Sequence, residues 1–237
     1  PALPDDLRQA PRLRALMRWL RAAATDLERN GRDPARCVDA LRPIAAEIWQ
    51  GLDRCQRERF LRHARTYWDV HRHRVDPEAL AILTRRLHDG RLEYHAAHFL
   101  SYTADDHGVV VRVRRRGAAA IGSLRVDWLV NCTGPERNLR RQSNPLVRAL
   151  LRRRLVRPDP LGLGASTGAH GELLDGAGRI VPGAFVVGPW RVGDLWESVA
   201  VPELRGHASV VAARIDAALT IPAPRFADVA SPPQYAV

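Results

Sequence analysis

The sequence predicts a mixed α/β protein that opens with a helical segment, and three observations support this fold class. Apolar residues recur at helical spacing across residues 1–90. The period then shortens to that of strands across residues 91–135. Residues 136–220 contain glycine-rich turns, one apolar strand and a closing helix, and the tail at 221–237 is expected to be loose. These four ranges are the predicted organisation of the chain.

The composition is that of an ordinary globular protein, with 46% hydrophobic and 27% charged residues in a chain of 237. A net charge of +11 invites a nucleic-acid partner, but all 37 basic residues are Arg, which favours codon bias over a selected binding face. No apolar run approaches the roughly 18 residues of a membrane span and no leader opens the chain. We therefore expect a cytoplasmic protein with no membrane partner, and nucleic acid is not the expected partner. The start at Pro1 rather than Met is typical of a piece of a longer protein.

Four helices are predicted in the first segment, each bounded by a start or stop signal. Their ranges are 7–27 before Asn30-Gly31, 34–52 with Asp33 as N-cap and a kink at Pro43, 56–70, and 77–88 between Asp76-Pro77 and Asp89-Gly90. Later helices are expected from Asn144-Pro145 and across 202–219.

Five strands are predicted, and two of them end in glycine. Their ranges are 91–94, 99–103, 109–114, 124–132 and 184–187, with a turn at 105–108. The apolar run at 128–130 is typical of a strand covered on both faces.

The first glycine-ended strand leads into Thr133, Gly134 and Pro135. Small residues at this point leave room for a flat ligand at the carboxyl edge of a sheet, where open α/β sheets bind nucleotides. The alternative is a plain exit from a strand into a loop.

The second glycine-ended strand leads into Gly188, Pro189 and Trp190, and a loop with Asp194 and Trp196 follows it. The closing helix then begins at Val201, Pro202 and Glu203 with no capping residue at the expected position. Its free N–H groups would suit the oxygens of a ligand. The alternatives are that Ser198 caps an earlier start or that water fills this role.

Together these stretches resemble the bacterial FAD/NAD(P)-binding protein family, within the flavoproteins with two dinucleotide-binding domains. The resemblance extends in the family's order over nearly the whole chain before the final helix. It is carried by residues 41–43, 48–49, 60–63, 67–74, 127–135, 158–164 and 184–205.

The resemblance implies a partial Rossmann-like FAD/NAD(P)-binding fold and an FAD-dependent, NAD(P)H-using oxidoreductase that acts on an unidentified small molecule. It implies that residues 91–135 belong to the NAD(P)-binding portion and 136–220 to the FAD-binding portion. The cofactor-binding residues would be Thr133, Gly134, Pro135, Gly188, Pro189, Trp190, Asp194, Trp196, Val201, Pro202 and Glu203. The closing helix would point its positive end at the pyrimidine side of the flavin.

Two departures from the family pattern limit this reading. Many relatives carry Gly-Asp where this chain has Gly188-Pro189, which puts a carboxylate contact to the ribityl chain in doubt, although Asp194 could replace it. No GxGxxG loop is present, so this piece alone should hold FAD weakly, and the N-terminal half of the protein would supply such loops. No catalytic acid or base is evident. The alternative function is a non-catalytic interaction module that has lost its cofactor.

Other patterns carry less weight. Ser166 lies in a GxSxG sequence, but a hairpin rather than a helix is expected behind it, which argues against a hydrolase. His63, Asp69, His71 and His73 lack the spacing of helical metal ligands, so no metal site is predicted. Arg72 and Arg74 are weak candidates for an NADP phosphate. Cys37, Cys55 and Cys132 are predicted to be reduced thiols, and Cys132 is expected to be buried. Most tryptophans are predicted to lie in the core. Trp190 and Trp196, beside the proposed flavin loop, are the exceptions.

Overall fold

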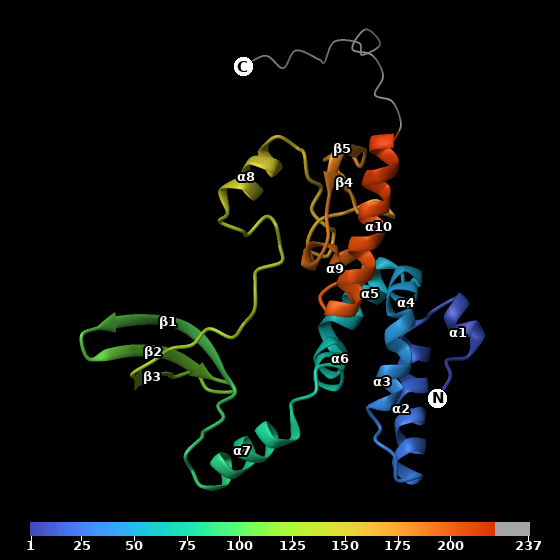
Figure 1. Cartoon of the computed structure of the whole chain (residues 1–237). Helices are drawn as coiled ribbons and strands as arrows, with labels where there is room; N and C mark the ends of the chain where they lie inside the picture. Colours follow the sequence, from blue (N-terminus) through green and yellow to red (C-terminus); the bar gives the residue numbers. More distant parts are fainter. Residues whose placement is uncertain (221–237) are drawn as a thin grey trace. The chain divides into compact units, whose positions relative to one another are not determined.

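The computed structural model describes residues 1–220, so the tail predicted to be loose at 221–237 lies outside the described residues (Figure 1). Within them the protein has helices and two small antiparallel sheets. The mixed α/β class is therefore confirmed. Two compact units are present: the first unit comprises Pro1–Arg72 and the described residues from Glu136 onwards, and the inserted unit comprises His73–Pro135.

The N-terminal part of the first unit is helical, as predicted, but it is divided more finely. Its elements are α1 (Asp5–Gln9), α2 (Leu13–Arg29), α3 (Arg36–Leu41), the 3-10 turn η1 (Arg42–Ile44), α4 (Ala45–Gly51), α5 (Arg54–His63) and α6 (Arg65–Arg72). Prolines explain two of the breaks, because Pro11 lies between α1 and α2 and Pro43 lies in η1. The Asp33 carboxylate accepts a hydrogen bond of 2.9 Å from the Ala35 N–H, just before α3.

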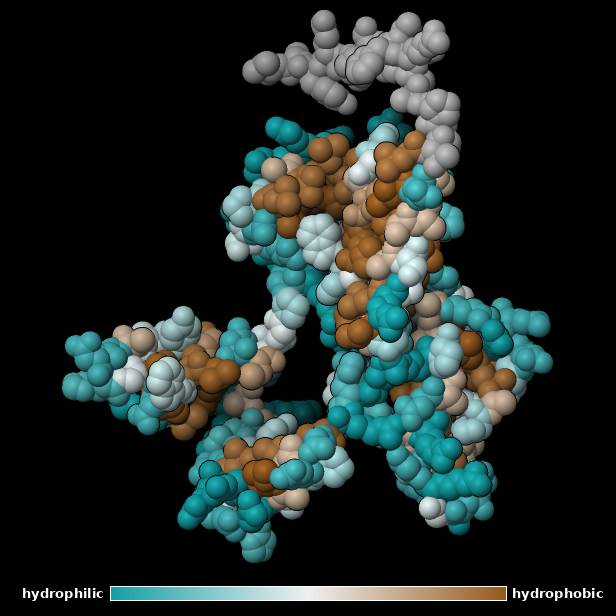
Figure 2. Space-filling model, in the orientation of Figure 1, coloured by the Kyte–Doolittle hydropathy of each residue, from teal (hydrophilic) through white to brown (hydrophobic). Residues whose placement is uncertain are grey.

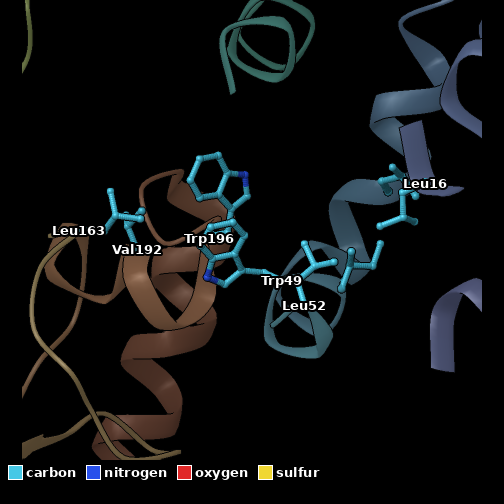
Figure 3. Close-up of a cluster of buried hydrophobic side chains, with 8 residues drawn as sticks. Leu16, Trp49, Leu52, Leu163, Val192 and Trp196 are labelled. Atoms are coloured by element: carbon cyan, nitrogen blue, oxygen red, sulfur yellow. The ribbon is translucent and has the colours of Figure 1, made fainter. Parts of the chain in front are cut away.

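An aromatic core joins these helices to the C-terminal part of the same unit (Figure 3). Trp49 of α4 stacks on Trp196 with ring centroids 4.8 Å apart, and Phe60 of α5 meets Trp196 edge-on at 5.0 Å. Leu163 and Val192 belong to the same buried cluster. Residues from opposite ends of the chain thus form one core.

The C-terminal part of the first unit has a second, smaller core. Its elements are α8 (Pro145–Arg152), β4 (Glu172–Leu174), β5 (Ile180–Phe185), the 3-10 turn η2 (Pro189–Arg191), α9 (Val192–Leu195) and α10 (Val201–Thr220). Leu139, Val147 and Ala165 are buried in this core. Strands β4 and β5 form an antiparallel pair. The predicted start at Asn144 is confirmed, because its side chain accepts hydrogen bonds from the Leu146 and Val147 N–H groups.

The inserted unit combines one helix with a three-stranded antiparallel sheet. Its elements are α7 (Pro77–His88), β1 (Ala97–Asp105), β2 (Gly108–Arg115) and β3 (Ile121–Val126), in the order β1-β2-β3. Asp76 caps α7 and the turn between β1 and β2 lies at 105–108, both as predicted.

Two predicted strands are wrong in this unit. Residues 91–94 form no strand, and the strand predicted at 124–132 ends with β3 at Val126. Trp128 is 86% exposed and Val130 is 76% exposed, so the apolar run at 128–130 is not covered on both faces. The run lacks a paired strand among the residues that the structure describes. Its backbone N–H and C=O groups therefore make no ladder hydrogen bonds that would stabilise a strand.

Candidate functional site

The candidate site is the stretch from Gly188 to Glu203, which connects β5 to the start of α10. Gly188 has φ of +96° and ψ of −149°, a conformation that is accessible in practice to glycine alone. Its carbonyl accepts a hydrogen bond of 2.9 Å from the Arg191 N–H, which starts the turn η2. The glycine therefore turns the chain sharply at the end of β5, as the sequence predicts for a strand-to-loop exit.

Asp194 lies in a buried polar network below this turn. Its Oδ2 atom accepts hydrogen bonds from the Thr167 N–H at 2.8 Å and from the Thr167 hydroxyl at 2.7 Å. The guanidinium of Arg191, which is 2% exposed, donates to the same hydroxyl at 3.2 Å and to the carbonyls of Gly168 and Ala169. Burial lowers the pKa of Arg191, and the negative charge of Asp194 opposes this shift. Asp194 thus holds the loop at 166–169, and a contact from it to a ribityl chain stays a prediction.

Trp196 is part of the core and not of an exposed loop. It is 8% exposed, stacks on Trp49, and has φ of +58°, which is rare for a bulky residue. The Trp49 Nε1–H donates to the Gly193 carbonyl at 2.7 Å, so the indole that stacks on Trp196 also holds the backbone of α9 three residues before it. Trp190 packs against the second core. The expectation that these two tryptophans are exceptions to core packing is therefore wrong.

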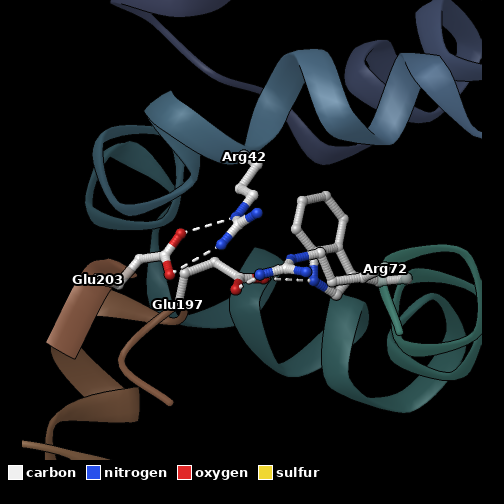
Figure 4. Close-up of polar contacts among 5 residues, drawn as sticks. Arg42, Arg72, Glu197 and Glu203 are labelled. Atoms are coloured by element: carbon white, nitrogen blue, oxygen red, sulfur yellow. Dashed lines mark hydrogen bonds and ion pairs between the residues drawn. The ribbon is translucent and has the colours of Figure 1, made fainter. Parts of the chain in front are cut away.

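Glu203, in the first turn of α10, is bound by Arg42 of η1 (Figure 4). The two side chains form a bidentate pair, with distances of 2.7 Å from Arg42 Nε and 3.1 Å from Nη2. Hydrogen bonding to Arg42 lowers the pKa of Glu203 and raises that of Arg42. The pair ties the start of α10 to the N-terminal helices.

A second pair, Arg72 with Glu197, lies deeper (Figure 4). Arg72 Nε is 3.4 Å from Glu197 Oε2, and the side chains are 11% and 7% exposed. The other oxygen of Glu197 accepts a hydrogen bond of 2.9 Å from the Trp68 Nε1–H. Arg72 is therefore engaged by Glu197, and a contact from Arg72 or Arg74 to a dinucleotide phosphate stays a prediction.

Several polar atoms around this pair lack a hydrogen bond. They are Arg72 Nε and Nη2, Glu197 Oε2, Ser198 Oγ and His207 Nδ1. Ser198 is fully buried and its hydroxyl has no partner among the described residues, so it does not cap α10. Arg72 Nε and Glu197 Oε2 face each other as an ion pair at 3.4 Å, whereas the Ser198 hydroxyl is buried without any partner among the described residues, which is rare in folded proteins.

The start of α10 itself is open to solvent. Val201 is 69% exposed and Pro202 is exposed as well, and the helix runs for 20 residues from this end. A helix of this length presents partial positive charge at its N-terminus. The start of α10 is thus exposed to solvent and carries the positive end of the helix dipole.

Thr133, Gly134 and Pro135 belong to the inserted unit, whereas the other predicted site residues belong to the first unit. The Asn131 side chain accepts hydrogen bonds from the Thr133 N–H at 3.0 Å and from its hydroxyl at 2.7 Å. Gly134 has φ of +79°, and a Cβ there would meet no atom within 4 Å. Glycine is required here by the turn rather than by crowding, and a role in ligand binding stays a prediction.

The weaker sequence patterns are placed as follows. Ser166 lies in an irregular segment that precedes the β4–β5 hairpin, as expected against a hydrolase elbow. Cys132 is exposed, so its predicted burial is wrong, and all three cysteines are free. The described residues contain no group of three or more His, Cys, Asp or Glu side chains arranged for a metal ion. None of the helices in residues 1–220 combines the length and apolar character needed to cross a membrane.

Sequence reasoning missed the partners that hold the site together. Trp49, Arg42 and Trp68 lie in the segments quoted for the family resemblance, yet nothing in their spacing shows that they contact Gly193, Glu203 and Glu197. Asp159, in another quoted segment, accepts hydrogen bonds from the Leu161 and Leu163 N–H groups, and its pKa is raised by burial. A Cβ on Gly193 would overlap its carboxyl group.

Comparisons with known proteins add no assignment. A scan against protein-family models, a search of curated proteins and a search of solved structures each found no match.

Proposed function

We propose that the chain is the C-terminal portion of an FAD-dependent, NAD(P)H-using oxidoreductase with a partial Rossmann-like fold. One observation carries the proposal: three of the segments that resemble the bacterial FAD/NAD(P)-binding protein family, 41–43, 48–49 and 67–74, contact residues 193–203. Trp49 binds Gly193, Trp68 and Arg72 bind Glu197, and Arg42 binds Glu203. These contacts bring the three segments to the loop that the resemblance places beside the flavin, which supports the proposal.

The residues present fit part of a flavin site. The exposed N-terminus of α10, at Val201, Pro202 and Glu203, offers positive potential to the electron-rich pyrimidine edge of a flavin. Gly188, Pro189 and Trp190 shape the approach to it, and Asp194 positions the loop beneath. FAD supplies hydride and electron transfer when bound. The pyrophosphate-binding glycine loop is absent from these 237 residues, so we expect firm binding to need additional sequence.

In this proposal the Arg42–Glu203 and Arg72–Glu197 pairs are positioning pairs that do not contact the cofactor. They hold the first turn of α10 and the segment before it at fixed places relative to the helical core. Because Glu203 is neutralised by Arg42, it does not cancel the positive end of the helix. The helix terminus can then stabilise negative charge on the reduced cofactor.

The test measures flavin binding by the complete gene product, with and without a substitution that introduces a negative charge at the start of α10. Val201→Asp adds a carboxylate at the exposed helix N-terminus, which stabilises the helix but competes with an electron-rich ligand. Val210→Asp is the matched control, because Val210 is 44% exposed and lies farther along the same helix. We expect the wild type to carry flavin absorbance that NADPH bleaches, and Val201→Asp alone to lose flavin or to lower its reduction potential. A colourless wild type that ignores added FAD would contradict the proposal.

A second candidate, the non-catalytic interaction module, is favoured by the inserted unit. Phe99, Tyr102 and Trp128 are 56%, 59% and 86% exposed there, which is unusual for aromatic side chains of a monomer. If this function is right, the complete gene product is colourless and forms a complex with a partner through this unit. Light scattering with and without Tyr102→Glu would then reveal the loss of that complex.

A further inference from the structure

A pocket of about 600 Å³ lies among the helices of the first unit, away from the stretch from Gly188 to Glu203 that forms the candidate site. It is formed by α2, α3, α5 and α6, which pack against one another (Figure 1). Ligand-binding pockets for small molecules are typically about 300–1,000 Å³. The volume therefore lies within the range of small-molecule sites.

The wall of the pocket is apolar and partly aromatic. Met17 and Leu20 line one side, and Phe60 and Trp68 line the other. The two aromatic rings meet edge-on at 6.5 Å, and the Trp68 indole is held in place by its hydrogen bond to Glu197. A rigid aromatic wall of this kind suits a flat, apolar ligand body.

None of the polar residues that line the pocket is acidic. They are Arg21 of α2, and His63, Tyr67 and His71 of α5 and α6. Arg21 is exposed and makes no ion pair with a carboxylate among the described residues. The His71 Nδ1–H donates to the Tyr67 carbonyl at 2.7 Å, which fixes the orientation of that ring. An anionic group at this point would meet only positive or neutral donors.

We propose that this pocket binds a small aromatic carboxylate, with the ring between Met17 and Phe60 and the carboxylate at Arg21. The combination of an apolar body and a cationic edge excludes neutral hydrocarbons as the preferred ligand and disfavours polyanions, which an apolar wall would desolvate at high cost. The site lies within the first unit and does not depend on the flavin proposal.

The experiment titrates the whole chain with naphthoate, and with naphthalenemethanol as its neutral isostere, by calorimetry. We expect saturable one-to-one binding of naphthoate and binding of the alcohol weaker by about tenfold, which is the scale of one charge-assisted contact. Equal affinity for the two probes, or no saturable binding of naphthoate, would overturn the proposal.

Variants of α2 locate the site. Ala24 lines the pocket, so Ala24→Trp should abolish binding, whereas Ala22→Trp, at an exposed position of the same helix outside the pocket, should not. Arg21→Gln should weaken naphthoate binding by about tenfold and leave the alcohol unchanged, with Arg14→Gln as its exposed control. Because Arg21 is at the surface, that variant keeps its fold even if Ala24→Trp does not. Unchanged naphthoate affinity in Arg21→Gln would place the anion elsewhere and overturn the assignment.

Discussion

The two compact units of this protein differ in the burial of their tryptophan side chains. In the first unit Trp49 and Trp196 are 3% and 8% exposed, and they stack in a core built from both ends of the chain. In the inserted unit Trp128 is 86% exposed, and Figure 2 shows hydrophobic surface on the sheet and on the helix α7.

This difference concerns how much of each unit's apolar surface is covered. Within residues 73–135, all of which the structure describes, Val111 is the single hydrophobic residue in the buried class. A three-stranded sheet with one helix has too little apolar contact to bury both faces, whereas helices from two distant segments enclose a core in the first unit. The first unit is therefore stabilised from within, and the inserted unit presents apolar surface of the kind that marks interaction sites.

The largest expected effect is the loss of an indole from the first unit. Trp49→Ala removes the stack on Trp196 and the hydrogen bond to the Gly193 carbonyl, and we expect a loss of about 3–5 kcal/mol in the free energy of unfolding. Trp128→Ala, its counterpart in the inserted unit, should change that free energy by about 0.5 kcal/mol or less. Urea unfolding followed by circular dichroism measures both. Similar losses in the two variants would remove the contrast between the units.

The next comparison is between two ion pairs. Arg72→Met leaves Glu197 buried without its cation and should cost on the order of 3 kcal/mol, because a buried charge needs a partner. Arg125→Met in the inserted unit breaks the pair with Asp105, whose side chains are 52% and 47% exposed, and should cost much less because solvent screens an exposed pair. The double variant Arg72→Met/Glu197→Gln should recover part of the loss. Failure of the double variant to recover any stability would show that Arg72 acts through packing alone.

Two glycines with positive φ, one in each unit, allow the packing of the two units to be compared. Gly164 has φ of +132°, and a Cβ there would overlap the backbone of Trp190, so Gly164→Ala should cost about 2–3 kcal/mol. Gly117 of the inserted unit has φ of +80° but open space around it, so Gly117→Ala should cost about 1 kcal/mol through backbone strain alone. Thermal unfolding of the two variants gives the comparison, and equal shifts would mean that the close approach at Gly164 relaxes freely.

The helices and the hairpin could be predicted from the sequence because their signals are local. Asp76-Pro77 and Asn144-Pro145 mark helix starts that the structure confirms, and the turn at 105–108 is confirmed as well. The strand expected at 128–130 failed because an apolar run specifies burial only where another strand covers it. The apolar pattern of this run therefore gave no information about its pairing.

The site was predictable only in outline, for a related physical reason. Gly188 and the start of α10 follow from backbone requirements that a sequence displays. The contacts from Arg42, Trp49 and Trp68 join residues more than a hundred positions apart, and no periodicity encodes them. The sequence predicts Trp196 as an exception to core packing beside the proposed flavin loop, and neither its burial against Trp49 nor its positive φ can be read from composition.

The smallest expected effect is a pH dependence of stability in the first unit that comes from His207 of α10. Burial lowers the pKa of His207 from its ordinary value of 6.5, and the positive charge of Arg191 lowers it further, while Glu203 opposes the shift. The unfolded chain therefore binds a proton more readily than the folded chain as the pH falls through 6.5, so the free energy of unfolding falls with pH below that value. His207→Gln removes this contribution and should flatten the fall between neutral pH and the onset of carboxylate titration. Urea midpoints across that range measure the slope. A variant with the wild-type slope would mean that other groups govern the response, and a steeper slope would mean that protonated His207 is stabilised by Glu203 rather than opposed by burial.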